Sequence, residues 1–317
     1  MKIVFFGTPS FSVPFLQALI DDPDTQVVGV VSQGDKPVGR GGEIQASPVK
    51  TLALSRAIPV FTPASLKTNS HIHDQLRELS ADVFVVVAYG KLIPQSILDI
   101  PPHGVVNVHP SLLPRHRGPS PMQFAIAQGD VFTGVTIMLL DAGMDTGPIL
   151  SFERIDLSAE ETYTTLSQKV QVTGSRLLIQ TLRRHLHGEI VPLPQDDSKS
   201  PATVTRLLDR EDGHINWTES METLERKSRA YIEWPGLWSV WTRSTDEQLR
   251  LKLLSIRPSD FTADDHPGTV TIKDSRLFID CADGTLEILE IQPEGKPKMQ
   301  AKAFVAGYLD INSAVLK

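Results

Sequence analysis

Short apolar runs alternate with amphipathic stretches along the first half of the chain. Runs of consecutive apolar residues predict buried strands, and apolar positions three or four residues apart predict helices. Because strands and helices alternate, the pattern favours an α/β domain with a mostly parallel sheet and helices on both faces, as in Rossmann-like folds. Strands are predicted at residues 3–6, 27–31, 83–88, 105–108 and 135–140, with helices near 11–20, 48–54, 75–79, 97–98 and 122–127.

The pattern changes after Gly188. Residues 191–201 are largely polar and are interrupted by prolines, which is typical of a linker. Farther on, short strands separated by turn residues favour a smaller, OB-like β-barrel. We therefore predict an α/β domain over 1–190, a linker over 191–206 and a β-barrel domain over 207–317. The barrel strands are predicted at 251–256, 268–272, 277–281 and 286–291.

Composition narrows the class of protein. No apolar run approaches the ~20 residues that span a bilayer, and the N-terminus lacks the layout of a signal peptide. A single cysteine, Cys281, excludes an internal disulfide and a multi-cysteine zinc site. We expect a cytoplasmic protein without a membrane partner. The net charge of −7 argues against bulk non-specific binding of nucleic acid, although it leaves room for a local basic site.

Gly7 follows the first predicted strand, where a dinucleotide site has to be considered. The residues after it supply neither the second and third glycines of the dinucleotide fingerprint nor a phosphate-loop lysine. The segment therefore predicts a strand-to-helix turn near a ligand crevice.

Candidate chemistry lies at the end of the fourth predicted strand. Side chains alternate between the faces of a strand, so Asn107 and His109 are expected on the same face. Open α/β sheets bind ligands where such strands end. An amide beside an imidazole can donate hydrogen bonds to an oxyanion that develops from a carbonyl group. A structural asparagine and a buried, inert histidine are an equally good reading of this pair alone.

A carboxylate adds to this pair. Asp145 lies in a loop after the fifth predicted strand, between Gly143 and Gly147, which indicates a fixed backbone path at the same sheet edge. A carboxylate near His109 would raise the pKa of the imidazole and could accept a proton from an attacking amine. The alternative is that Asp145 or Asp141 only bonds turn amides, and this alternative suits Asp141 better.

These residues carry a resemblance. The run from Asn107 to Pro114, the pair Arg117-Gly118 and Asp145 resemble the folate-dependent formyltransferases. Further matches cover nearly the whole chain and point to the branch that acts on initiator tRNA. They lie at 1–9, 35–41, 47–50, 86–90, 211–217, 234–236, 292–299, 304 and 307–308.

The resemblance implies a formyl-group transferase that supports translation initiation. Its co-substrate would be 10-formyltetrahydrofolate, with no metal, and the acceptor would be the α-amine of methionine on initiator tRNA. It implies that Asn107 and protonated His109 stabilise the oxyanion while Asp145 keeps His109 charged. The expected partners are this tRNA and the folate, and the expected state is a monomer.

The resemblance also implies binding residues. Ser111, Leu112, Leu113 and Pro114 would form part of the folate pocket, with Leu92 lining it. Lys36 and Arg40 lie in a glycine-rich loop expected to contact the acceptor stem. Apart from the resemblance, Arg206 belongs to a group of basic residues close enough in sequence to form a phosphate-binding patch.

Three rival functions share some of these residues. A formyltransferase acting on a nucleotide-linked amino sugar would share the three catalytic side chains, but the match over 292–299 and the barrel argue against it. A formyltetrahydrofolate hydrolase would need an added N-terminal domain, for which a first strand at Ile3 leaves no room. A non-catalytic folate- or tRNA-binding module is weakened because all three side chains are present.

Overall fold

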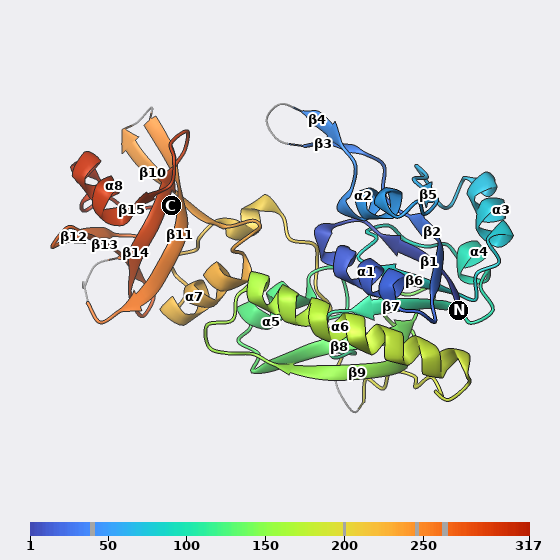
Figure 1. Ribbon diagram of the computed structural model, residues 1–317. Coiled ribbons are helices and arrows are strands. Elements are labelled where there is room, and N and C mark those ends of the chain that lie inside the picture. The colour runs from blue at the N-terminus through green and yellow to red at the C-terminus, as the bar shows by residue number, and fades with distance from the viewer. Residues whose placement is uncertain (39–41, 199–200, 245–246, 262–265) are drawn as a thin grey trace. The chain divides into compact units, whose positions relative to one another are not determined.

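The computed structural model describes residues 1–38, 42–198, 201–244, 247–261 and 266–317 (Figure 1). The described chain forms two compact units. Unit 1 comprises residues 1–121, 132–156 and 167–205, and unit 2 comprises 122–131, 157–166 and 206–317. The predicted domain limits stay a prediction.

A seven-stranded sheet in the order β5-β2-β1-β6-β7-β8-β9 forms the centre of unit 1. Strands β5, β2, β1, β6 and β7 are parallel to one another. Strand β8 runs antiparallel to β7, and β9 runs antiparallel to β8. The predicted mostly parallel sheet is confirmed, but β5 and β9 were not predicted. The strands are β1 (Lys2–Gly7), β2 (Gln26–Val31), β5 (Val60–Phe61), β6 (Val83–Val87), β7 (Val105–His109), β8 (Phe132–Leu139) and β9 (Ile149–Asp156), beside a separate hairpin of β3 (Lys36–Val38) and β4 (Glu43–Gln45).

Helices cover both faces of this sheet. On one face, apolar residues of α3 and α4 pack in one cluster with Val4, Phe6 and Phe84. On the other face, Gly174 of α6 closely approaches Phe15 of α1 and Val135 of β8. None of the described helices is both long and apolar enough to cross a membrane. The helices are η1 (Ser10–Ser12), α1 (Val13–Asp21), α2 (Pro48–Ser55), α3 (Ser70–Glu78), α4 (Gln95–Leu98), α5 (Pro121–Ala127) and α6 (Tyr163–Leu186).

The predicted linker is bound to unit 1 over its described residues. Leu193 forms a β-bridge with Ile149, and the main chain of Arg117 exchanges hydrogen bonds with Thr203 and Thr205. A polar, proline-interrupted sequence can therefore follow a fixed path when its backbone groups find partners in an adjoining loop. This path brings the segment beside the candidate site.

Unit 2 contains an antiparallel sheet in the order β10-β11-β14-β13-β12, with β15 paired to β14. The last residues of the chain bond to both outer strands, β10 and β12. Lys317 pairs with Val240 of β10, and the Ala314 carbonyl accepts from the Val270 amide of β12. This closure agrees with the predicted barrel, although β10 was not predicted. The elements are η2 (Arg210–Gly213), α7 (Met221–Ala230), β10 (Leu237–Ser244), β11 (Glu247–Ser259), β12 (Val270–Lys273), β13 (Arg276–Cys281), β14 (Gly284–Pro293), β15 (Met299–Gln300), α8 (Ala301–Gly307) and η3 (Leu309–Ile311).

A buried carboxylate in the barrel predicts acid sensitivity of unit 2. Glu287 is 5% exposed and accepts hydrogen bonds from Arg276 and Arg257. These guanidinium groups lower the pKa of Glu287 from 4.5 to about 2. Because the folded-state pKa lies below the unfolded one, the stabilisation is complete above the unfolded pKa and is lost as the pH falls towards about 2.

We therefore expect Glu287→Gln to lower the melting temperature at pH 7, and we expect this difference to shrink as the pH falls from 4.5 towards 2. Thermal unfolding followed by circular dichroism across this range measures it. Glu290→Gln is the matched control on the same strand, because that carboxylate lies 3.7 Å from Lys298 and should matter less. A pH-independent difference for Glu287→Gln would contradict the expectation.

Candidate active site

Strand β7 places Asn107 and His109 at the end of a buried parallel strand, as predicted. Asn107 lies opposite Val86 of β6 and Met138 of β8, and it is 9% exposed. In the part of the chain that the structure describes, its side chain has no hydrogen-bond partner. The polar atoms of the carboxamide are not fully buried, so a ligand or water can bond to them. Asn107 is therefore available for a substrate.

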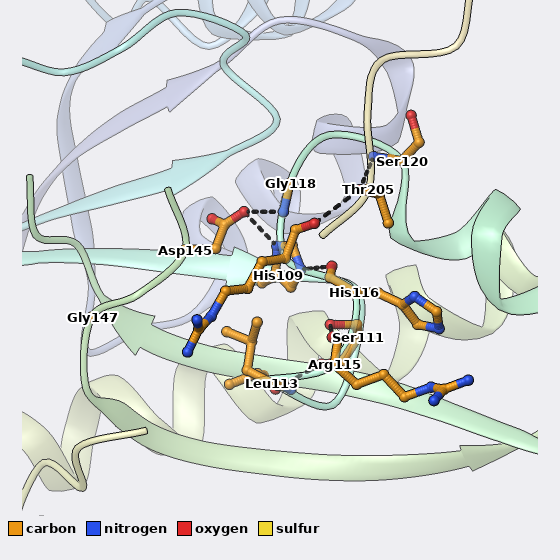
Figure 2. Close-up of polar contacts among 12 residues, drawn as sticks. His109, Ser111, Leu113, Arg115, His116, Gly118, Ser120, Asp145, Gly147 and Thr205 are labelled. Carbon is orange, nitrogen blue, oxygen red and sulfur yellow. Dashed lines mark hydrogen bonds and ion pairs between the residues drawn. The ribbon is translucent and has the colours of Figure 1, made fainter. Parts of the chain in front are cut away.

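His109 is held from both ring nitrogens (Figure 2). Its Nε2 lies 2.9 Å from the carbonyl oxygen of His116, and its Nδ1 lies 3.6 Å from Oδ2 of Asp145. A carbonyl accepts only, so Nε2 carries a proton, and in the neutral ring Nδ1 is then the free acceptor. In the neutral ring, Nδ1 can therefore take up a proton, and it lies beside the Asp145 carboxylate.

The pKa of His109 departs from the sequence expectation. Burial lowers the pKa of His109, while the Asp145 carboxylate and the bond to the His116 carbonyl oppose this change without reversing it. The expectation that Asp145 raises the pKa of His109 agrees with the effect of that carboxylate, but the effect of burial is larger. Removing the imidazolium from water costs more than one carboxylate at this distance returns. This shift favours the neutral ring in the resting protein.

Asp145 reaches His109 by a route that the sequence did not predict. Strand β8 runs antiparallel to β7 and ends with Leu139 opposite Val106, three residues before His109. The loop therefore begins away from His109, yet Asp145 itself lies beside His109, as the prediction of a shared sheet edge required. The loop folds back, and Asp145 accepts a hydrogen bond of 2.7 Å from the Gly118 amide. By contrast, the Asp141 carboxylate bonds within the loop, to Gly143 and Thr146.

Close backbone approaches hold these loops in place. Gly118 has a φ of +98°, and a Cβ there would lie 2.5 Å from the carbonyl oxygen of Thr205. At Gly147 a Cβ would lie 1.9 Å from the carbonyl oxygen of Leu139. Only glycine fits at either position. The two loops that meet at Asp145 are therefore fixed by contacts that a side chain would break.

The residues expected in the folate pocket lie in the loop after β7. Ser111 donates its hydroxyl to Arg115, and the Leu113 amide donates to Thr136. Leu113 and Pro114 are buried and Leu112 is half-buried, whereas Leu92 is 85% exposed. The apolar loop residues therefore adjoin His109, and Leu92 presents an apolar side chain to solvent.

The residues expected to contact tRNA are distributed over both units. Lys36 begins β3, is exposed and donates to Gln33. Arg40 lies outside the described residues. Arg206 is bonded to Asp212, which raises the pKa of the guanidinium through that side-chain hydrogen bond. An ion pair with Asp212 competes with a phosphate for the same guanidinium donors.

Within the described ranges, no group of three or more His, Cys, Asp or Glu side chains could hold a metal ion. The site instead combines an amide, an imidazole and a carboxylate. These groups can stabilise an oxyanion and move one proton, which is the chemistry of acyl transfer to an amine.

Comparison with known proteins decides the family. The formyl transferase family model matches residues 1–182, and the model of the formyl transferase C-terminal domain matches 207–309. A methionyl-tRNA formyltransferase from Roseiflexus sp. is 42% identical over 302 residues, which is 95% of this chain and 90% of that protein. The chain belongs to the methionyl-tRNA formyltransferase family. The enzyme of that name from Myxococcus xanthus is 40% identical, covering 97% of this chain and 95% of its own.

The fold is also shared outside the methionyl-tRNA formyltransferase family. The N-formyltransferase from Helicobacter canadensis, solved with folinic acid and dTDP-3-aminofucose, has a TM-score of 0.64 at 17% identity. The alignment covers 91% of this chain and 98% of that one. At this identity the likeness concerns the fold alone.

Sequence reasoning missed the groups that hold His109 and Asp145. The His116 carbonyl, the Gly118 amide and the side chain of Gln195 all contact one of the two. Two of these are backbone groups, which no residue type reveals. His116 and Gly118 both have a positive φ, which sets the path of the loop that carries these two backbone groups. For Gly118, the residue type could have indicated this backbone conformation, because glycine adopts a positive φ without strain.

Proposed function

We propose that this protein transfers the formyl group of 10-formyltetrahydrofolate to the α-amine of methionine carried by initiator tRNA, and so supports translation initiation. Identity of 36–42% to methionyl-tRNA formyltransferases over nearly the whole chain carries this proposal. The convergence of Asn107, His109 and Asp145 supports it chemically.

Asn107 acts on the developing oxyanion in this proposal. As the amine attacks the formyl carbon, the carbonyl oxygen gains negative charge. The unpartnered carboxamide of Asn107 donates to that oxygen. The side chain gives up no hydrogen bond within the described protein when it donates to the oxyanion, so no such loss offsets the stabilisation of the charge.

His109 carries the proton in the same reaction. Nδ1 takes a proton from the amine as the new carbon–nitrogen bond forms. Asp145, 3.6 Å away, stabilises the resulting imidazolium, which in turn favours the oxyanion. When the bond to the folate nitrogen breaks, His109 returns the proton to that nitrogen. Formylated amine and tetrahydrofolate are released, and the enzyme regains its neutral imidazole.

Substrate binding is assigned to the segments around this centre. Ser111, Leu112, Leu113 and Pro114 would flank the folate, with Leu92 covered when it binds. Lys36, Arg40 and Arg206 would contact tRNA phosphates, and Arg206 would exchange Asp212 for a phosphate. A tRNA affinity that does not weaken with salt would contradict these phosphate contacts.

One assay separates the candidate functions. The protein is incubated with 10-formyltetrahydrofolate and with methionyl-initiator-tRNA, a nucleotide-linked amino sugar, or water alone. We expect tetrahydrofolate release and formylmethionyl-tRNA only in the first reaction. Release with the amino sugar would favour the sugar enzyme, whose fold this chain shares. Release in water would favour a hydrolase, and no release would favour a binding module.

We also propose that the protein works as a monomer in the cytoplasm, where aminoacylated tRNA is used. Light scattering should give the mass of one chain, 34.9 kDa. A concentration-independent mass of twice that value would overturn the monomer.

A further inference from the structure

We propose that Gln195 is a positioning residue for formyl transfer: its side chain fixes the main chain of the loop that presents Asp145 to His109. The inference rests on the proposed function. It assigns a role to the segment that connects the two units in sequence, which composition alone marks as a linker.

Asp145 needs such support because its backbone is unfavourable. Its φ of +54° is uncommon for a residue other than glycine and persists only where the surroundings impose it. The hydrogen bond from Gly118 acts on one carboxylate oxygen and does not engage the Asp145 main chain. A second constraint is therefore needed to fix the direction of the side chain.

Gln195 supplies that constraint with both of its amide hydrogens. Nε2 donates to the carbonyl oxygens of Asp145 at 2.8 Å and of Gly147 at 2.9 Å. The two acceptors flank Thr146, so the amide spans the part of the loop that turns. Carbonyls only accept, and this defines the orientation of the Gln195 amide.

The other end of the Gln195 side chain is fixed as well. Its Oε1 accepts from Nε of Arg117 at 3.0 Å and from Nη2 at 2.7 Å. Arg117 in turn forms an ion pair of 2.8 Å with Asp197. Every donor and acceptor direction of the Gln195 amide is thus used, and substitution by any residue without an N–H leaves two carbonyls unpaired.

The same segment also holds the second loop of the site. Thr203 accepts from the His116 amide, and Thr205 accepts from the Ser120 amide. The loop between them carries the His116 carbonyl that binds His109 and the Gly118 amide that binds Asp145. Gln195, Thr203 and Thr205 therefore join the supports of the base and of its carboxylate, with Gln195 as the contact on the Asp145 side.

Gln195→Met tests this role, because methionine has a similar length and no N–H. We expect kcat with methionyl-tRNA to fall about 10–100-fold, as for a misplacement of about 1 Å at a reacting group. The KM values should change little. Ser198→Ala is the matched control, since among the described residues that hydroxyl bonds to Asp196 on the same segment and not to the Asp145 loop. Gln195→Glu, which keeps an acceptor for Arg117 but lacks both N–H groups, should lose kcat as Gln195→Met does.

Two further readouts distinguish positioning from general damage. In the double variant with Asp145→Asn, the Gln195→Met loss should largely disappear, because both changes remove the same interaction. The acid limb of kcat/KM should move to lower pH in Gln195→Met, because a displaced carboxylate supports the imidazolium less. Losses that multiply, an unmoved acid limb, or a kcat within twofold of wild type in both single variants would overturn the proposal. A wild-type enzyme that does not formylate methionyl-tRNA would instead overturn the proposed function.

Discussion

Asn107→Ala is expected to lower kcat by about 10²–10³-fold, the usual cost of removing one donor to an oxyanion. The carboxamide bonds to no group in the described protein, so its donors are available for the oxyanion of the proposed reaction. For the same reason, the folate KM should change by less than about threefold. Steady-state kinetics with purified methionyl-tRNA, varying each substrate in turn, separates kcat from KM.

We expect the loss of kcat in Asn107→Ala to occur without a loss of folding stability. Truncating Asn107 breaks no side-chain hydrogen bond within the described residues, so the melting temperature should change little. Asn69→Ala is the matched control in the same unit, because Asn69 caps α3 by accepting from the Ile72 amide. It should lower stability by about 1 kcal/mol and leave kcat unchanged. A retained kcat in Asn107→Ala would remove this residue from the mechanism.

The central strands of the fold could be predicted because their apolar runs are local features. Alternation along β7 then placed Asn107 and His109 on one face without any tertiary information. Strand direction is not local. Nothing in the run that forms β8 indicates that it pairs antiparallel with β7, so the route by which the Asp145 loop reaches His109 could not be predicted.

The supports of the site were beyond prediction for a different reason. Gln195 lies in a stretch whose prolines and polar residues are typical of linkers, and its four hydrogen bonds join it to residues 48–78 positions away. For Arg206, the residue type suggested a role, but the structure shows a different partner. Its charge suggested phosphate binding, but an aspartate six residues later already occupies the guanidinium. Residue type indicates what a side chain can do, and only the fold determines which partner it finds.

The pH dependence of Asp145→Asn is the strongest test of the proton path. His109 must start neutral to accept the amine proton, so kcat/KM should fall on the acid side with the pKa of His109. Burial places that pKa below the usual value of about 6.5. The groups that face the ring are Asp145, whose charge raises the pKa of His109, and His116, whose charge lowers it while its carbonyl raises it.

Replacing Asp145 by asparagine removes the largest influence that raises the pKa of His109, so the acid limb should move to lower pH. The plateau rate should fall by roughly 10²–10⁴-fold, because the imidazolium formed during transfer loses its counter-ion. Titration of the substrate amine is common to both enzymes and cancels when their profiles are compared. Asp141→Asn is the matched control, since in the described structure that carboxylate bonds within the loop, to Gly143 and Thr146, and its loss should leave the acid limb in place. An activity that rises towards acid pH would instead mean that His109 enters the reaction already protonated.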